Sequence, residues 1–145
     1  MLKKSLWIWI LLHSGWAWAQ LTPVGLWKTV DENTGQARSL IRITEAGGIY
    51  TGRVEKSLDP TSKPGALCHK CDDDRKDKPI IGLDIIRGIR ANRDEPGLFD
   101  GGEVVDPESG RIYRFSLKPI EMGEKLRVRG YFGPFFRSRV WLRAE

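Results

Sequence analysis

The clearest structural signal in this sequence lies in residues 102–118, which read GEVVDPESGRIYRFSLK. In the central segment 106–110, the proline fixes φ for a type I turn and the final glycine supplies the left-handed residue that realigns two strands. After this turn, aromatic and aliphatic residues alternate with polar ones, so the apolar side chains share one face of a strand. The stretch therefore predicts a β-hairpin with strands at 102–105 and 111–118.

The rest of the chain repeats this pattern of strand and turn. Short runs rich in β-branched and aromatic residues are separated by clusters of Gly, Pro, Asn and Asp. Segment 83–90 also fits helical spacing, but its isoleucine content and its glycines favour a strand. Residues 58–78 form a long loop that contains both cysteines. The remaining strands are expected at 25–30, 37–44, 49–56, 125–131 and 140–143.

Eight short strands without a long helical stretch favour an all-β fold. Antiparallel strands in sequence order close most simply into an up-and-down barrel, which removes exposed edges. The interior of an eight-stranded barrel is filled by side chains or holds one small ligand. A β-sandwich is the alternative architecture. Residues 20–145 are long enough for one such domain with a single core.

Residues 1–19 have the pattern of a cleavable secretory leader. Lys3 and Lys4 give a positive start, residues 6–12 are apolar, and small residues precede a cleavage point after Ala19. A transmembrane anchor is the competing interpretation, but a spanning helix needs about 20 apolar residues, and this run is shorter. We therefore expect a protein of the periplasm or the extracellular space, whose mature chain follows the leader.

The composition argues against several classes of function. Of the 24 basic residues, Lys3 and Lys4 belong to the leader, which leaves 22 basic against 19 acidic residues. A net charge of +3 is too weak for the concentrated basic stripe of a nucleic-acid-binding protein. His69 is the single histidine beyond the leader, and the sequence has no G-x-S-x-G, P-loop or dinucleotide-binding motif. We therefore predict no catalytic residues, no cofactor and no nucleic-acid partner.

Both ends of the expected domain carry motifs of lipocalin-like barrels. Gly25-Leu26-Trp27 is similar to the Gly-x-Trp start of their first strand, and Trp141-Leu142-Arg143 supplies an arginine that lies across that tryptophan in such barrels. Together with four further segments, these motifs make the chain resemble DUF2147, a bacterial family of secreted proteins of unknown function. The four segments are Cys68-His69-Lys70-Cys71, Pro79-Ile80-Ile81-Gly82-Leu83, Gly101-Gly102-Glu103-Val104-Val105-Asp106-Pro107 and Val128-Arg129-Gly130-Tyr131.

The resemblance implies a lipocalin-like barrel in the bacterial envelope and no established reaction. Three of its residues, Gly25, Trp27 and Arg143, are expected to be structural. An arginine over a tryptophan ring contributes roughly 0.5–2 kcal/mol and would close one end of the barrel. The glycine would let the chain pass beneath the ring.

The C-x-x-C motif of Cys68 and Cys71 is the sharpest chemical feature. Two cysteines in an exported protein most simply form a disulfide, which in so small a ring stabilises by roughly 2 kcal/mol. A thiol redox pair uses the same spacing, but such pairs begin a helix, and none is predicted here. Zinc needs four ligands, and we expect no metal site. The acidic run 72–74 lacks the spacing of a calcium loop and is expected to be solvated.

The candidate ligand-binding residues are aromatic and basic. Residues 133–136 combine a Gly/Pro turn with paired phenylalanines, an unusual apolar patch at an expected barrel mouth. Arginines on either side, at positions 127, 129, 137 and 139, could meet an anionic head group. The alternative is a packed core beside a solvated basic strand face. The candidate set consists of Tyr50, Tyr113, Arg129, Tyr131, Phe135 and Phe136.

These features favour a non-enzymatic exported barrel that binds a small apolar or amphiphilic ligand carrying a carboxylate or phosphate. Apolar inward side chains would supply affinity, and a tyrosine hydroxyl or an arginine would orient the polar end. Two alternatives stay open. The barrel is a scaffold that contacts envelope lipid or another envelope protein, or Cys68 and Cys71 form the centre of a thiol oxidoreductase.

Overall fold

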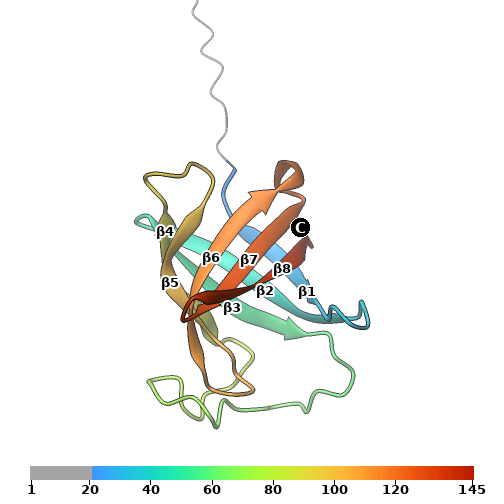
Figure 1. Ribbon diagram of the computed structural model, residues 1–145. Helices are drawn as coiled ribbons and strands as arrows, with labels where there is room; N and C mark the ends of the chain where they lie inside the picture. The colour runs from blue at the N-terminus through green and yellow to red at the C-terminus, as the bar shows by residue number, and fades with distance from the viewer. Residues whose placement is uncertain (1–20) are drawn as a thin grey trace, which may run out of the picture.

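Eight antiparallel strands close into one barrel in the computed structural model, which describes residues 21–145 (Figure 1). Each strand pairs with its sequence neighbours, and β1 closes the cylinder by pairing with β8. This confirms the expected up-and-down barrel and rules out the sandwich. The expected leader, residues 1–19, lies outside the described residues. The strands are β1 (Gly25–Val30), β2 (Ala37–Ala46), β3 (Ile49–Ser57), β4 (Asp84–Ala91), β5 (Phe99–Val105), β6 (Ile112–Ile120), β7 (Lys125–Phe132) and β8 (Phe135–Arg143).

Helical structure is confined to one short turn in the described part of the chain. The 3-10 helix η1 (Glu121–Gly123) connects β6 to β7. Within residues 21–145, no helix has the length and apolar character that crossing a bilayer would require.

Two strands begin earlier than the sequence pattern predicts. Strand β8 starts at Phe135 rather than at position 140, so the β7–β8 turn consists of Gly133 and Pro134 alone. The pattern fails because Arg137 and Arg139 occupy inward positions, where an apolar residue is expected. Strand β5 likewise starts at Phe99, before the glycine pair. The other strands agree with the expected ones to within two residues at each end.

The helical spacing in segment 83–90 comes from an irregular strand. Ile86 and Ile89 are both fully buried although they lie three residues apart. Gly52 pairs with Ile86 and Tyr50 with Ile89, so the register shifts between them. Gly88 lies in this shift with φ +73°, a conformation that glycine adopts without steric cost. The bulge turns both isoleucines into the barrel.

The core fills the barrel and is dominated by aromatic and branched side chains. The Tyr50 and Phe99 rings meet edge to face with centroids 5.0 Å apart, and the Phe115 and Trp141 rings lie 6.2 Å apart. Apolar burial of this kind is the main source of stability. The inward residues with the least exposure are Trp27, Ile41, Ile43, Ile86, Ile89, Leu117 and Leu126.

One end of the barrel, which we call the closed end, is sealed by Trp27 and Arg143. The indole is fully buried and donates a hydrogen bond of 2.8 Å to the Pro23 carbonyl. The Arg143 guanidinium carbon lies 4.3 Å from the ring centroid, and its Nε donates to the Gly123 carbonyl at 2.6 Å. Gly25 has φ +142°, and a Cβ there would lie 2.5 Å from the guanidinium. The clamp therefore requires glycine at this position.

The opposite end, which we call the mouth, is formed by the β1–β2, β5–β6 and β7–β8 turns (Figure 1). The long β3–β4 loop, residues 58–83, lies at this end beside the β5–β6 turn. The two ends thus differ: one is clamped, and the other is framed by turns and a loop.

Loss of the clamp should destabilise the barrel. We expect Arg143→Gln to lower the free energy of unfolding by about 1–2 kcal/mol, because it removes the contact with the indole and a hydrogen bond. Urea unfolding followed by tryptophan fluorescence measures this change. The matched control is Arg127→Gln, since Arg127 lies opposite Lys118 and Val140 on the outer face. Equal destabilisation by the two variants would contradict the assignment.

Candidate functional site

A cavity of about 490 Å³ opens at the mouth of the barrel. Its size lies within the range of small-molecule sites. Residues from the β5–β6 turn and from strands β6, β7 and β8 line it. They are Asp106, Arg111, Tyr113, Phe115, Val128, Gly130, Phe132, Arg137 and Arg139.

The floor and one wall of the cavity are apolar. Phe115 and Val128 are buried at its base. The rings of Tyr113 and Phe132 meet edge to face with centroids 6.3 Å apart. Gly130 leaves space between these groups, because a Cβ there would meet nothing closer than the Tyr113 Cβ at 3.9 Å. A hydrophobic segment of a ligand can occupy this part.

Strand register brings two arginines into the cavity. In β8, Trp141 is inward and buried opposite Leu126. Alternate residues of a strand share a face, so Arg139 and Arg137 also point inward. They lie opposite Val128 and Gly130 of β7. The inward face of β8 therefore carries the Trp141 indole in the core and the guanidinium groups of Arg139 and Arg137 near the mouth.

The rim of the cavity carries more positive than negative charge. Arg139 forms an ion pair with Glu32 of the β1–β2 turn. The Asp106 carboxylate accepts hydrogen bonds from the Glu108 amide and the Ser109 hydroxyl, both within the β5–β6 turn. Within residues 21–145, the guanidinium groups of Arg111 and Arg137 have no hydrogen-bond or ion-pair partner. Such groups bind carboxylate or phosphate oxygens through charge-assisted hydrogen bonds.

The six ligand-binding residues predicted from sequence fall into four places. Tyr113 lines the cavity. Tyr50 lies in the core against Phe99, where burial raises the pKa of its phenol. Phe135 is exposed at the start of β8, beside the mouth.

The other three predicted residues form a layer on the outer face of the barrel. The Tyr131 hydroxyl lies 3.1 Å from the Ser116 hydroxyl. The Arg129 Nε donates to the Ser138 hydroxyl at 2.8 Å, and its guanidinium stacks 4.8 Å from the Phe136 ring centroid. The structure therefore separates Arg129, Tyr131 and Phe136 from the cavity that Tyr113 lines.

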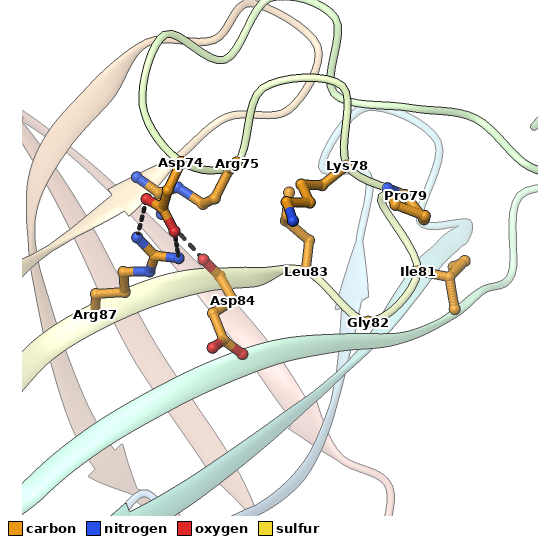
Figure 2. Close-up of a pocket in the computed structure, with 9 residues that line it drawn as sticks. All are labelled: Asp74, Arg75, Lys78, Pro79, Ile81, Gly82, Leu83, Asp84 and Arg87. Atoms are coloured by element: carbon orange, nitrogen blue, oxygen red, sulfur yellow. Dashed lines mark hydrogen bonds and ion pairs between the residues drawn. The ribbon is translucent and has the colours of Figure 1, made fainter.

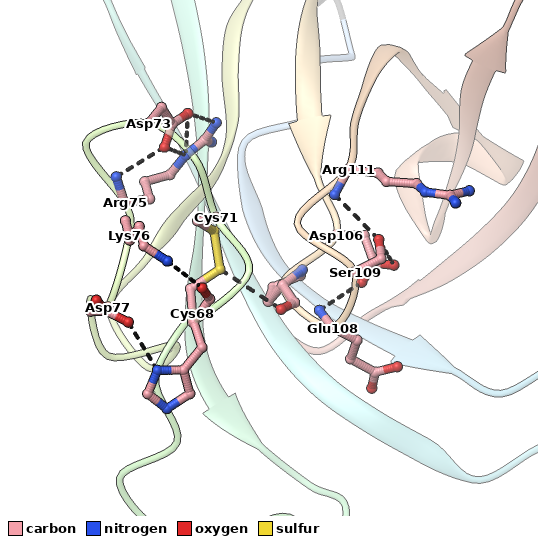
Figure 3. Close-up of a disulfide and its surroundings, with 12 residues drawn as sticks. Cys68, Cys71, Asp73, Arg75, Lys76, Asp77, Asp106, Glu108, Ser109 and Arg111 are labelled. Atoms are coloured by element: carbon pink, nitrogen blue, oxygen red, sulfur yellow. Dashed lines mark hydrogen bonds and ion pairs between the residues drawn. A yellow bond between two sulfur atoms is a disulfide. The ribbon is translucent and has the colours of Figure 1, made fainter.

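The expected disulfide is confirmed between Cys68 and Cys71, and both residues are buried. Figure 3 shows it within the β3–β4 loop, facing the β5–β6 turn, and the Cys68 sulfur lies 3.7 Å from the Pro107 carbonyl oxygen. The crosslinked loop thus supports the turn that carries Asp106 and Arg111. Its burial leaves neither sulfur open to a protein-sized redox partner.

Of the acidic run in this loop, Asp72 and Asp74 are exposed, as expected, whereas Asp73 is half-buried beside an arginine that the sequence did not single out. Arg75 is only 1% exposed, and its guanidinium binds both carboxylate oxygens of Asp73 and the Asp84 carbonyl oxygen. These hydrogen bonds lower the pKa of Asp73 to about 2. Sequence reasoning missed Arg75 because an arginine among acidic residues is normally a surface group.

A second, smaller cavity of about 210 Å³ lies between this loop and the start of β4 (Figure 2). Of its charged groups, Arg87 and Asp74 form an ion pair with each other, whereas Arg75 and Asp84 pair with Asp73 and Arg53, which do not line it. Figure 2 shows Arg87 bridging to both oxygens of Asp74, at 2.7 and 2.9 Å. The cavity at the mouth is larger and combines an apolar floor with arginines at its rim, so we take it as the candidate site.

Comparisons with known proteins agree with this architecture. Residues 25–143 match a family model described as an uncharacterized protein conserved in bacteria (DUF2147). The fold is similar to that of protein HP1028 from the human pathogen Helicobacter pylori, which is described as belonging to the lipocalin family. The TM-score is 0.71 and the identity 12%, over 86% of this chain and 84% of that one. No curated protein matches the sequence.

The buried ion pair in the loop predicts a defined pH dependence. We expect Asp73→Asn to lower the free energy of unfolding by about 2 kcal/mol at neutral pH, because it leaves the Arg75 charge buried with weaker pairing. The pKa of Asp73 is lowered from 3.8 to about 2 in the folded protein. The contribution of the ion pair to the free energy of unfolding is therefore complete above pH 3.8 and is lost as the pH falls through about 2.

Urea unfolding at neutral pH and in acid measures the difference between the wild type and the variant. That difference should shrink steadily as the pH falls below 3.8. Asp72→Asn is the control, because Asp72 is an exposed neighbour of the same charge. If the difference in the free energy of unfolding did not change with pH, the ion pair between Asp73 and Arg75 could not be its source.

Proposed function

Because this chain belongs to the DUF2147 family and folds as a lipocalin-like barrel, we propose that it binds a small amphiphilic anion in the mouth of the barrel. The observation that carries the proposal is the pairing of an apolar cavity with unpaired guanidinium groups at its rim. An apolar segment would enter toward Phe115, and an acidic head group would remain near Arg137 and Arg111.

The apolar part of the cavity supports affinity for hydrocarbon. Burial of each methylene group contributes about 0.8 kcal/mol, and Phe115, Val128 and Tyr113 offer the surface for it. Gly130 opposite Arg137 adds no side chain of its own to the cavity, and a Cβ there would meet nothing closer than the Tyr113 Cβ at 3.9 Å. A linear or single-ring ligand fits this shape better than a bulky one.

The charges at the rim support selection of an anion. A guanidinium binds a carboxylate or phosphate through parallel hydrogen bonds, which are stronger than neutral ones. Arg139 already holds the carboxylate of Glu32, which shows that this part of the rim accommodates such a group. Arg137 lies two residues away on the same strand face and has no partner within residues 21–145.

The proposal is one of binding rather than catalysis. His69 pairs with Asp77 on the exposed loop at 2.9 Å and does not line the cavity. Among residues 21–145, no three side chains of the metal-ligating types converge. We also place the protein in the periplasm or outside the cell, because residues 1–19 have the pattern of a secretory leader and the disulfide suits an oxidising compartment.

Binding of dodecanoate and of dodecanol by the purified protein tests the proposal. Arg137→Gln should weaken dodecanoate binding about tenfold, because it removes one charge-assisted contact, and should leave dodecanol binding unchanged. Gly130→Leu should abolish the binding of both, because the new side chain projects into the cavity between its floor and its rim. Isothermal titration calorimetry measures each affinity.

Arg127→Gln is the matched control, since it removes the same charge from the outer face. Circular dichroism verifies that Gly130→Leu keeps its strand content. The proposal fails if the wild type binds neither compound, or if Gly130→Leu folds and retains both. Mass spectrometry of natively purified protein then identifies the ligand carried from the cell.

A further inference from the structure

The tip of the β7–β8 hairpin exposes three phenylalanines. Phe132, Phe135 and Phe136, which we call the aromatic tip, are 45%, 66% and 55% exposed. The two-residue turn of Gly133 and Pro134 places all three at the extreme end of the hairpin. The Phe132 and Phe135 rings lie 6.2 Å apart, so they form a joint apolar surface. A clustered exposed patch of this kind marks an interaction site.

The β7–β8 hairpin carries basic side chains and no acidic ones. Residues 125–143 contain six basic and no acidic side chains, whereas the rest of residues 20–145 contains 16 basic and 19 acidic ones. Two of the arginines near the tip stack on aromatic rings. Arg114 of the neighbouring strand β6 lies 5.6 Å from the Tyr131 ring centroid, and Arg129 lies 4.8 Å from that of Phe136. Basic side chains therefore lie on the strands beside the aromatic tip.

From these observations we propose that the aromatic tip inserts into the surface of an anionic lipid bilayer. Exposed aromatic side chains enter the interfacial layer of a membrane, and arginines beside them meet anionic head groups. The tip is the end of a hairpin rather than a groove, which suits a planar and deformable surface. Its excess of basic over acidic residues complements an anionic lipid.

The geometry joins this surface to the candidate site. Phe132 belongs to the aromatic tip and also lines the cavity. An amphiphile that leaves the bilayer beside the tip would therefore enter the mouth without crossing bulk water. Phe135 and Phe136 do not line the cavity, so attachment to lipid and binding of the ligand can be disrupted separately.

Sedimentation with lipid vesicles tests the proposal. The purified protein should sediment with vesicles of phosphatidylcholine and phosphatidylglycerol, much less with phosphatidylcholine alone, and less as salt is raised. Phe135→Ser combined with Phe136→Ser should weaken this binding about tenfold or more, through the loss of apolar insertion. Met122→Ser is the control, because Met122 is 90% exposed on η1 at the closed end.

A tryptophan reporter locates the contact. The two native tryptophans of the described chain, Trp27 and Trp141, are buried, so they give a constant background. Fluorescence from Phe135→Trp should shift to shorter wavelength on anionic vesicles and be quenched by brominated lipid. Fluorescence from Met122→Trp should not change.

Three results would overturn the proposal: no binding to either kind of vesicle, equal binding by the double serine variant, or equal quenching at both reporter positions. Crosslinking of the tip to an envelope protein with no binding to vesicles would assign the surface to a protein partner instead. The double serine variant should still bind dodecanoate, and Gly130→Leu should still bind vesicles. These two results separate the failure of this proposal from failure of the proposed function.

Discussion

The contact between Arg143 and Trp27 holds together the narrowest seam of the barrel. Strands β1 and β8 share only two paired positions, and one of these pairs is Trp27 with Arg143. Strands β7 and β8, in contrast, share eight. The guanidinium therefore acts where the ladder of hydrogen bonds is shortest, and it also binds the carbonyl oxygen of Gly123 in η1. The contact therefore reinforces the closure of the cylinder at the point where backbone pairing is most limited.

From the core toward the mouth, the inward side chains change from apolar to partly basic. Strand β8 shows the change most directly, because its inward residues run from Trp141 in the core to Arg139 and Arg137 at the rim. The outer face has a separate support. There, the β3–β4 loop buries the disulfide and Arg75 beside the β5–β6 turn. The core thus provides stability, while the loop and the ends of the strands arrange the site.

Much of the fold was predictable from the sequence, because strand alternation and turn chemistry are local signals. The hairpin at 102–118 follows from them, whereas the disulfide follows from the presence of two cysteines in an expected exported protein. The site was less predictable, since Arg137 and Arg139 point inward and so break the alternation that marks a strand. Counting back by two from the buried Trp141 would have found both arginines. No local pattern could have revealed that Arg75 is buried, because its partners include Asp84 and Glu103 on other strands.

Gly130 has a consequence for how such a pocket can diversify. It lies in a regular stretch of β7, paired with Phe115 on one side and Arg137 on the other, and the space above its Cα is free. A side chain added at this position would therefore project into the cavity without removing a backbone pairing of the strand. Replacement by Ala and then by Val would reduce the accessible depth of the cavity in steps. Selectivity for ligand length could evolve there while the scaffold stays unaltered.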